Sequence, residues 1–368
     1  MLRRILVLAA TLASAAPLAA QSIGDIGARI APQIHSYTIG APTSETITEY
    51  ALPLYVLLPV NPSLSFDLGT AYAQSRVEQT GTDGKKITST ISGMTDTQLR
   101  ANYVIGTDFI VLTAGVNLPT GESTVLTKQQ LAAGLIGSDF LAFPISNMGT
   151  GFGATGGVAI AEPVGDWSLG GGVSVRKSAA YDAFSDAGGA RFHYQPGNEY
   201  RARVGLDRGV GTGRFTVGLT YSTFGNDNLA GSIYNTGNRW LTQLGFDNTY
   251  GPGQLTLTAW NLYRQAGTIA DSSYLPHENI ADAALSYGVT VGSAIVEPNI
   301  EARLWTPVGS ARSSMGTIGL RSQMQFLGTT MLPSIGYSFG RLGAQDANGL
   351  NTTASLTGYH ASLAIRLR

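Results

Sequence analysis

Apolar and polar residues alternate with a period of two along most of the chain. In residues 199–207, EYRARVGLD, tyrosine, alanine, valine and leucine alternate with charged residues and a glycine. The same alternation returns at 97–105, 213–222, 318–326 and 359–367. Because successive side chains of a β-strand point to opposite faces, each segment is predicted to be a strand with one apolar and one polar face.

Two all-β architectures show this pattern. In a soluble antiparallel sandwich or barrel the apolar face forms a packed core, and strands average about five to six residues. In a transmembrane barrel the apolar face meets lipid, the polar face lines the lumen, and each strand needs about ten residues or more. The candidate strands here run for roughly 11 to 17 residues. We therefore predict an all-β fold, a transmembrane antiparallel β-barrel with a short helix in one long loop.

The breaks between candidate strands alternate between short and long, as expected for short periplasmic turns and longer outer loops. If both chain ends lie in the periplasm, one further strand is needed before residue 46, and residues 30–40 can supply it. This gives about sixteen strands, or about fourteen if that segment is only an arm. The short breaks lie at 61–62, 106–107, 162–166, 208–213, 251–253, 292–293 and 328–329, and the long ones at 79–91, 119–148, 181–196, 225–235, 268–276, 307–312 and 344–351.

The N-terminus indicates export. Residues 1–20, MLRRILVLAATLASAAPLAA, contain two arginines, an apolar run and then small residues, which is the layout of a secretory signal peptide. We expect residues 21–368 to form the outer-membrane barrel domain. The chain has no cysteine, which excludes a disulfide framework and a lipoprotein anchor. Without the signal it has 21 Lys and Arg against 24 Asp and Glu, so no basic field indicates nucleic-acid binding.

The long outer loop at 119–148 is too apolar to be a solvated tether. Loops of this length in a compact fold are usually functional or disordered. The segment TKQQLAAGLIGSDFLAF predicts a helix of about two to three turns. The loop either packs as a flap on the barrel rim, touching lipid headgroups, or folds inward to narrow or gate the lumen. The candidate constriction residues are Gln129, Leu131, Leu135, Phe140 and Phe143.

Charged side chains fall on the polar, lumen-facing side of the predicted strands. After the signal, arginine outnumbers lysine 17 to 4, which favours fixed, multiply bonded guanidinium groups. These charges either form ion pairs that stiffen a polar interior, or give a pathway a weak preference for anions. The candidate pore-lining residues are Arg100, Arg176, Glu199, Arg201, Arg203, Arg214, Arg239, Glu297, Glu301, Arg303, Arg321 and Arg366.

Motifs for catalysis or cofactor binding are weak. The fingerprint GFGATG at 151–156 lacks the helix that a dinucleotide-binding loop needs, so it is interpreted as the beginning of a strand. The motif GYSFG at 336–340 matches a serine-hydrolase elbow, but Ser338 lies in mid-alternation and is expected to be an inner-face serine. The four histidines are scattered, and no metal-ligand motif is present. We expect no enzyme activity, no cofactor and no metal site.

One segment carries a family resemblance. VNLPTGE at 116–122, followed by a long loop and a glycine-rich strand, resembles the outer-membrane transporters of the phenol meta-cleavage degradation family, which often show L-P-T-G-[DE] in that context. The resemblance covers predicted strands four to six. The chain ends on Leu367-Arg368, whereas bacterial barrels commonly end on Phe or Trp. The resemblance implies passive or gated uptake of small, often aromatic or hydrophobic compounds, and supplies no catalytic residues.

The sequence therefore predicts an outer-membrane channel or transporter for passive uptake of small molecules. Its expected partners are outer-membrane lipid and a small-molecule solute. The alternative is a structural or surface-interaction barrel with a plugged lumen. Nothing in the sequence specifies an oligomeric state.

Overall fold

The computed structural model describes residues 27–40, 44–81, 84–106, 110–269, 273–326, 328–345 and 350–367. The predicted signal peptide, residues 1–20, lies outside the described residues. Among the described residues, no helix combines the length and the apolar character that a membrane-spanning helix needs.

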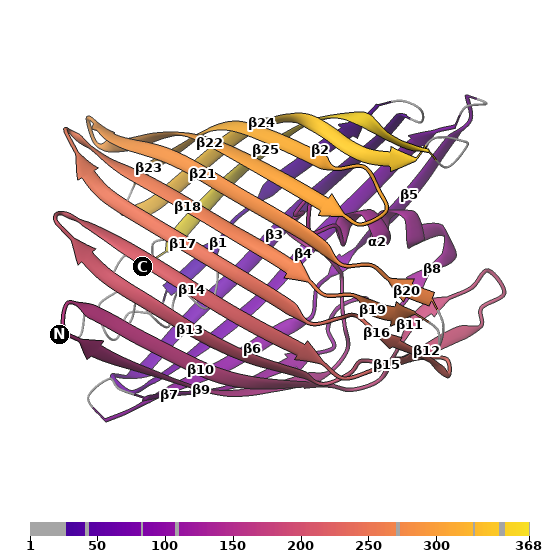
Figure 1. Ribbon diagram of the computed structural model, residues 1–368, viewed down its shortest axis with the longest axis horizontal. Coiled ribbons are helices and arrows are strands. Elements are labelled where there is room, and N and C mark those ends of the chain that lie inside the picture. The colour runs from indigo at the N-terminus through magenta and orange to yellow at the C-terminus, as the bar shows by residue number, and fades with distance from the viewer. Residues whose placement is uncertain are drawn as a thin grey trace.

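Sixteen antiparallel strands form a closed barrel in the described part of the chain (Figure 1). The first is interrupted and consists of β1 (Gly27–Ile30) and β2 (Gln33–Ile39). β25 (Asn351–Leu367) pairs with both of its parts, which pair in turn with β3 (Ser44–Asn61), so the barrel closes. The segment predicted at 30–40 is therefore a true strand and not an arm, and the prediction of sixteen strands is confirmed.

The fourth barrel strand is also interrupted. It consists of β5 (Lys86–Met94) and β6 (Thr97–Ile105), which both pair with the same neighbour, β4. The remaining strands follow in chain order: β4 (Leu64–Thr80), β7 (Ile110–Leu118), β9 (Gly153–Val164), β10 (Trp167–Ser178), β13 (Glu199–Val210), β14 (Gly213–Phe224), β17 (Arg239–Tyr250), β18 (Gly253–Arg264), β21 (Glu278–Val291), β22 (Ala294–Pro307), β23 (Ser313–Phe326) and β24 (Thr329–Gln345).

An apolar band covers the outer face of the barrel. Val204, Leu244 and Ile318 point outward from three different strands and are 55%, 45% and 54% exposed. Cross-strand partners share a face, so the alternation continues from strand to strand around the barrel. A closed barrel with an apolar outer surface satisfies its backbone internally and presents apolar side chains to lipid. The protein is an outer-membrane β-barrel. The end with the longer loops is assigned as extracellular and the end with the short turns as periplasmic.

The extracellular loops are more ordered than the sequence predicted. Segments predicted as polar loops contain short strands, which form a second sheet of seven strands at one end of the barrel (Figure 1). These strands have two to five residues, too few for a period-two pattern to reveal them. They are β8 (Val125–Leu126), β11 (Tyr181–Ser185), β12 (Arg191–Gln195), β15 (Asp227–Leu229), β16 (Ser232–Asn235), β19 (Gly267–Ile269) and β20 (Ser273–Leu275).

The predicted outer loop at 79–91 is shorter than expected. β4 continues to Thr80 and β5 begins at Lys86, and the two pair in register up to that point. Their outward side chains there are polar, as in the ion pair between Arg76 and Glu78, at 2.6 Å. Strand pairing thus continues above the apolar band. The outward residues are polar there, so the alternation of apolar and polar residues that predicts a strand is absent from the sequence.

The long loop lies inside the barrel. After β7 the chain forms β8, a short 3-10 helix at Thr127–Gln129 and the helix α2 (Gln130–Ile136), and then returns to β9. In Figure 1, α2 lies near the extracellular end, behind the strands nearest the viewer. The largest cluster of buried apolar side chains in the described residues lies between this loop and the inner face of the wall.

Candidate functional site

Asp96 fixes both ends of the long loop to the barrel wall. It lies between β5 and β6, where the fourth strand is interrupted, and it is buried. Its carboxylate accepts hydrogen bonds from the backbone N–H groups of Gly121 (3.1 Å) and Thr150 (2.6 Å) and from Asn117 Nδ2 (2.8 Å). The two ends of the loop, after β7 and before β9, are therefore bound by the same carboxylate, that of Asp96.

The VNLPTGE segment forms the base of this anchor. Thr120 Oγ1 accepts a hydrogen bond from the Thr97 N–H (2.8 Å) and donates one to the Thr95 backbone oxygen (3.1 Å). The next residue, Gly121, passes close to the returning chain, and a Cβ there would lie 2.1 Å from the Met148 backbone oxygen. Glycine is therefore required at this position. In this chain, the motif that resembles the transporter family positions the loop.

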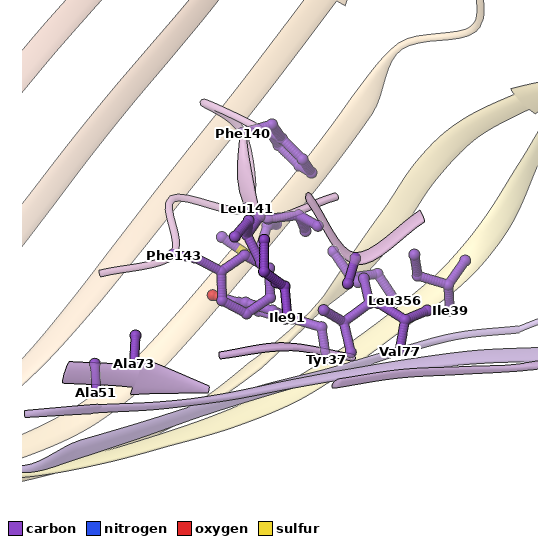
Figure 2. Packing of buried hydrophobic residues seen from close by; sticks show 14 of the residues in the cluster. Tyr37, Ile39, Ala51, Ala73, Val77, Ile91, Phe140, Leu141, Phe143 and Leu356 are labelled. Carbon is purple, nitrogen blue, oxygen red and sulfur yellow. The ribbon is translucent and has the colours of Figure 1, made fainter. Parts of the chain in front are cut away.

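An apolar cluster holds the loop against the inner face of the wall. Phe140, Leu141 and Phe143 are buried in it, and Figure 2 shows Leu141 and Phe143 close to barrel side chains such as Ile91, with Phe140 set apart from them. The rings of Tyr37 and Phe143 meet edge-on, with centroids 5.4 Å apart. Burying one large apolar side chain contributes about 1.5–3 kcal/mol, so the cluster favours the docked loop. The barrel contributes Tyr37, Ile39, Ile47, Ala51, Ala73, Val77, Ile91, Ile280, Met315, Ala354 and Leu356.

Polar side chains of the nearby wall satisfy the backbone of the loop. Glu49 on β3 is fully buried and accepts hydrogen bonds from the Ile145 N–H (2.9 Å) and from Ser75 Oγ (2.8 Å). Ser89 Oγ on β5 donates to the Lys128 backbone oxygen (2.7 Å) and accepts from the N–H of Ala132 in α2 (3.2 Å). Buried backbone groups need such partners, so these residues fix where the loop sits.

A second set of contacts holds the loop to the far wall. Arg303 Nη1 on β22 donates a hydrogen bond of 2.9 Å to the Phe140 backbone oxygen. The same guanidinium donates to Asp282 Oδ2 (2.8 Å) and Glu301 Oε1 (2.7 Å). The Phe140 ring stacks on Trp305, with centroids 5.9 Å apart and planes 27° apart. A charge-assisted hydrogen bond and a stacked ring therefore meet at the tip of the loop.

The origin of the loop and the contact of its tip lie on opposite sides of the barrel. The loop leaves the wall at β7, the fifth barrel strand, and its tip contacts β22, the thirteenth. In a closed barrel of sixteen strands, this separation is half of the circumference. Between these two points its contacts follow the inner wall along β5, β4, β3, β2, β25, β23 and β22, so the loop packs along one side of the lumen near its extracellular end. The loop therefore folds inward and is not a flap on the rim, whereas a role in narrowing or gating the lumen stays a prediction.

The strand register places the predicted pore-lining residues on the inner face. Several form ion pairs along or across strands: Arg201 with Glu199 at 2.6 Å, and Arg321 with Glu297. Arg214 pairs with Asp207, which the predicted set did not include. The pairs of Arg321 and Arg214 cross-link neighbouring strands, whereas Arg201 and Glu199 lie on one strand, and exposed pairs contribute little stability, about 0–1 kcal/mol each. A role of these residues in a conducting path stays a prediction.

Three of the predicted pore-lining residues contact the loop or its anchor. Arg176 Nη2 contacts Thr150 Oγ1 at 3.4 Å, beside the Asp96 anchor. Arg303 and Glu301 pair with each other, and the Arg303 side chain is only 11% exposed because the loop covers it. Arg239 instead packs on the wall, where its guanidinium lies 5.3 Å from the Phe224 ring centroid.

The predicted constriction residues all lie within the inward loop. Phe140 and Phe143 are in the apolar cluster, and Leu131 and Leu135 are half-buried against it. Gln129 instead stabilises the start of the helical segment, because its Oε1 accepts a hydrogen bond from the Leu126 N–H at 2.9 Å. Whether these side chains narrow a path for solutes stays a prediction.

The weak sequence motifs have structural roles. Gly151 has a φ of +75°, and a Cβ there would lie 3.2 Å from Tyr181, while β9 begins two residues later at Gly153. Ser338 lies within β24 and shares a hydrogen bond of 2.9 Å with Thr317. A strand therefore occupies the place where a hydrolase elbow needs a turn into a helix.

Two of the histidines that are scattered in the sequence are neighbours in the fold. His35 on β2 and His360 on β25 are cross-strand partners whose rings stack, with centroids 5.3 Å apart. Within the described residues, no group of three or more histidine, cysteine, aspartate or glutamate side chains is arranged to hold a metal ion.

Four residues of the site were not predicted from the sequence. The strand interruption at Thr95 and Asp96 itself contains no glycine or proline, and Glu49 and Ser89 lie within ordinary alternation. A carboxylate between the apolar residues Ile47 and Ala51 on the inner face was the signal that could have identified Glu49. Trp305 was recognisable only as an inward aromatic residue, since its partner Phe140 is distant in the chain.

No family model and no curated protein matches this chain. Among solved structures, it is similar to outer-membrane expressed OmpT of Vibrio cholerae, with 10% identity, a TM-score of 0.44, and coverage of 95% of this chain and 99% of that chain. It is also similar to a deltaS2 mutant of the TodX monoaromatic hydrocarbon channel, with 9% identity, a TM-score of 0.46, and coverage of 94% and 90%. These similarities are weak, and the barrel assignment rests on the strand pairing and the apolar outer face.

Proposed function

We propose that this protein is an outer-membrane channel for the passive uptake of small molecules through the barrel lumen. The observation that supports this most is a contrast between the two halves of the lumen. Toward the extracellular end, the inward loop buries Phe140 almost completely, at 1% exposed. Toward the periplasmic end, inward-facing Tyr55 remains 58% exposed. A narrow, loop-filled segment above an open polar segment suits a constricted channel.

Solutes that are aromatic or hydrophobic fit this proposal best. The loop meets the wall through Phe140, Phe143, Tyr37 and Trp305, so a solute passing beside a displaced loop would contact aromatic surfaces. Aromatic pairs add about 0.5–1.5 kcal/mol beyond the burial of their area, which gives such solutes an advantage over sugars of similar size.

A plugged barrel that binds a partner at the cell surface is the second candidate. The observation that favours it is the seven-stranded extracellular sheet, together with the anchoring of the loop tip by Arg303. In this case the lumen would be closed permanently, and the short strands would present the binding surface.

Osmotic swelling of liposomes distinguishes the two candidates. Liposomes containing the refolded mature protein would be compared with protein-free liposomes in solutions of a pentose and of a trisaccharide. A channel admits the pentose faster than the trisaccharide, and addition of an aromatic alcohol slows the flux by occupying the aromatic contacts. Swelling equal to that of protein-free liposomes for both sugars would exclude the channel and favour the plugged barrel.

A further inference from the structure

Two arginines face each other near the periplasmic end of the lumen. Arg29 of β1 and Arg366 of β25 are direct cross-strand partners, and the register places both on the inner face. Opposed residues of an antiparallel pair have Cα atoms roughly 4.5–5.5 Å apart, so the two guanidinium groups share one small region. Like charges directly opposite each other are unfavourable unless something compensates them.

No carboxylate among the described residues forms an ion pair with either arginine. The other arginine pair of the lumen differs in this respect. Arg239 and Arg264 are also cross-strand partners, but Arg264 Nε donates to Glu278 at 2.7 Å and Arg239 lies over an aromatic ring. Arg29 Nε, like Arg239 Nε, is buried and has no hydrogen-bond partner, but within the described residues no ion pair or aromatic ring compensates Arg29 or Arg366. A buried, unsatisfied donor beside a second cation indicates a place for an acceptor that carries negative charge.

An aromatic ring borders the arginine pair. Arg29 has Tyr55 as its cross-strand partner on the other side, and this side chain also points inward. The Tyr55 ring lies over Gly69, where a Cβ would be 3.0 Å from the ring atom Cε1. Glycine therefore leaves space for the ring, and the residue is 58% exposed to the open part of the lumen.

The nearby acid is already engaged. Asp67 lies on β4, two residues before Gly69, and accepts a hydrogen bond of 2.8 Å from Asn102 Nδ2. On the other flank, the cross-strand partner of Arg366 is Thr330, whose hydroxyl contacts Gln325 at 2.8 Å. Apart from Asp67, the side chains around the pair are an aromatic ring and neutral polar groups, which cannot neutralise two positive charges.

We propose that Arg29, Arg366 and Tyr55 form a binding site for the carboxylate of a small organic acid. The planar guanidinium fork matches the two oxygens of a carboxylate, and the tyrosine ring offers a surface for the organic part. Inorganic phosphate shares the oxyanion chemistry but has no apolar part to place on the ring. This inference names a solute class for the proposed channel, and it rests on that function for its role in uptake.

Titration calorimetry on the refolded mature protein in detergent micelles tests the site. Benzoate is the probe, benzyl alcohol is the neutral analogue and inorganic phosphate is the anion without an apolar part. The test variant carries Arg29→Gln and Arg366→Gln together. The matched control carries Arg191→Gln and Arg208→Gln, which removes the same number of arginine charges outside the predicted pore lining, and heat-modifiable mobility on gels confirms that each variant folds.

We expect the parent and the control to bind benzoate with the same affinity. The test variant should bind benzoate at least about tenfold more weakly, because hydrogen bonds to charged groups are lost. Equal benzoate binding by all three proteins, or none by the parent, would overturn the proposal. Benzyl alcohol or phosphate binding as tightly as benzoate would also overturn the organic-acid assignment. If the protein binds benzoate but gives no solute flux, the channel is refuted and the carboxylate site is retained. If it gives solute flux but does not bind benzoate, the carboxylate site is refuted and the channel is retained.

Discussion

Arg303 Nη1 on β22 donates a hydrogen bond of 2.9 Å to the backbone oxygen of Phe140, which precedes it by 163 residues. The contact joins the tip of an inward loop to the wall opposite its origin. Asp282 and Glu301 hold the Arg303 guanidinium through ion pairs that do not involve the loop. The position of the loop tip on the wall therefore depends on this ion-pair cluster and on the aromatic stack beside it.

The first prediction concerns the stack at the loop tip. Phe140→Ala should release the tip, because truncating a buried phenylalanine costs roughly 3–5 kcal/mol. Lys128 is the only lysine or arginine between residues 119 and 152, and its backbone oxygen is bound by Ser89 in the docked loop. Trypsin cleavage after Lys128 should become faster in the variant. The control is Phe152→Ala, which truncates an exposed ring near the same loop, and equal cleavage rates in both variants would refute the prediction.

The second prediction compares two glycines of the same loop. Gly121→Ala places a Cβ 2.1 Å from the Met148 backbone oxygen, so the backbone must shift, at a cost of about 1–3 kcal/mol. Gly134→Ala, inside α2, meets nothing within 4 Å and should stabilise the helix by roughly 0.5–1 kcal/mol. Urea unfolding should show a lower midpoint for the first variant only. A Gly121→Ala midpoint equal to that of Gly134→Ala would contradict the proposed anchor.

The third prediction tests which face of the wall meets lipid. Leu244 and Gln243 are adjacent on β17, and the first points outward while the second points inward. Leu244→Arg should destabilise the barrel in lipid vesicles by about 2–4 kcal/mol, because a cation near the bilayer midplane is costly. Gln243→Arg should cost much less, since the lumen is polar. Equal unfolding free energies for the two variants would contradict the assignment of faces.

The fourth prediction concerns the extracellular sheet at high pH. Tyr194 donates a hydrogen bond of 2.8 Å to Asp227 Oδ2, and burial, followed by this carboxylate, raises the pKa of Tyr194 above its ordinary value of 10.0. A raised pKa means that the phenol stabilises the sheet fully below pH 10 and that this contribution is lost as the pH rises further.

Ultraviolet difference titration should therefore show a tyrosine ionisation well above pH 10 that is missing in Tyr194→Phe. Tyr234→Phe removes a tyrosine from β16, which pairs with the strand of Asp227, and should retain that late transition. Superposable curves for the parent and Tyr194→Phe would contradict the prediction. Removing the hydrogen bond should also cost the sheet about 0.5–1.5 kcal/mol at neutral pH, measurable by hydrogen exchange at residues 191–195.

Period-two alternation predicted most of the barrel because the requirement is local. Each side chain must face either lipid or lumen, so neighbours such as Tyr200 and Arg201 show their faces in the sequence itself. The short strands of the extracellular sheet do not follow this rule, since both of their faces meet water or other loops. Their pairing depends on which loops come together above the barrel, and this is not visible in two to five residues.

The site was predictable in part for the same reason. Phe140 and Phe143 were selected because apolar residues in a long loop need a place to be buried. The wall residues that contact the loop were not predicted, because Tyr37, Glu49 and Trp305 are far from it in the chain. Each of them looks like an ordinary inward residue in the sequence. The closed barrel alone brings them together. Asp96 was missed because its function depends on a strand interruption that leaves no mark in the sequence.

Single-channel conductance in a planar bilayer tests the proposed channel most directly. The refolded parent would be compared with a variant in which residues 123–147 are replaced by a short Gly/Ser linker, while Gly121 and Thr150 are kept for the Asp96 anchor. A variant with residues 187–189 shortened is the control, since it alters an extracellular hairpin outside the lumen. We predict steady current steps that grow when the inward loop is replaced and stay unchanged in the control. Silence in the parent and in the loop-replaced variant would contradict a channel through the lumen.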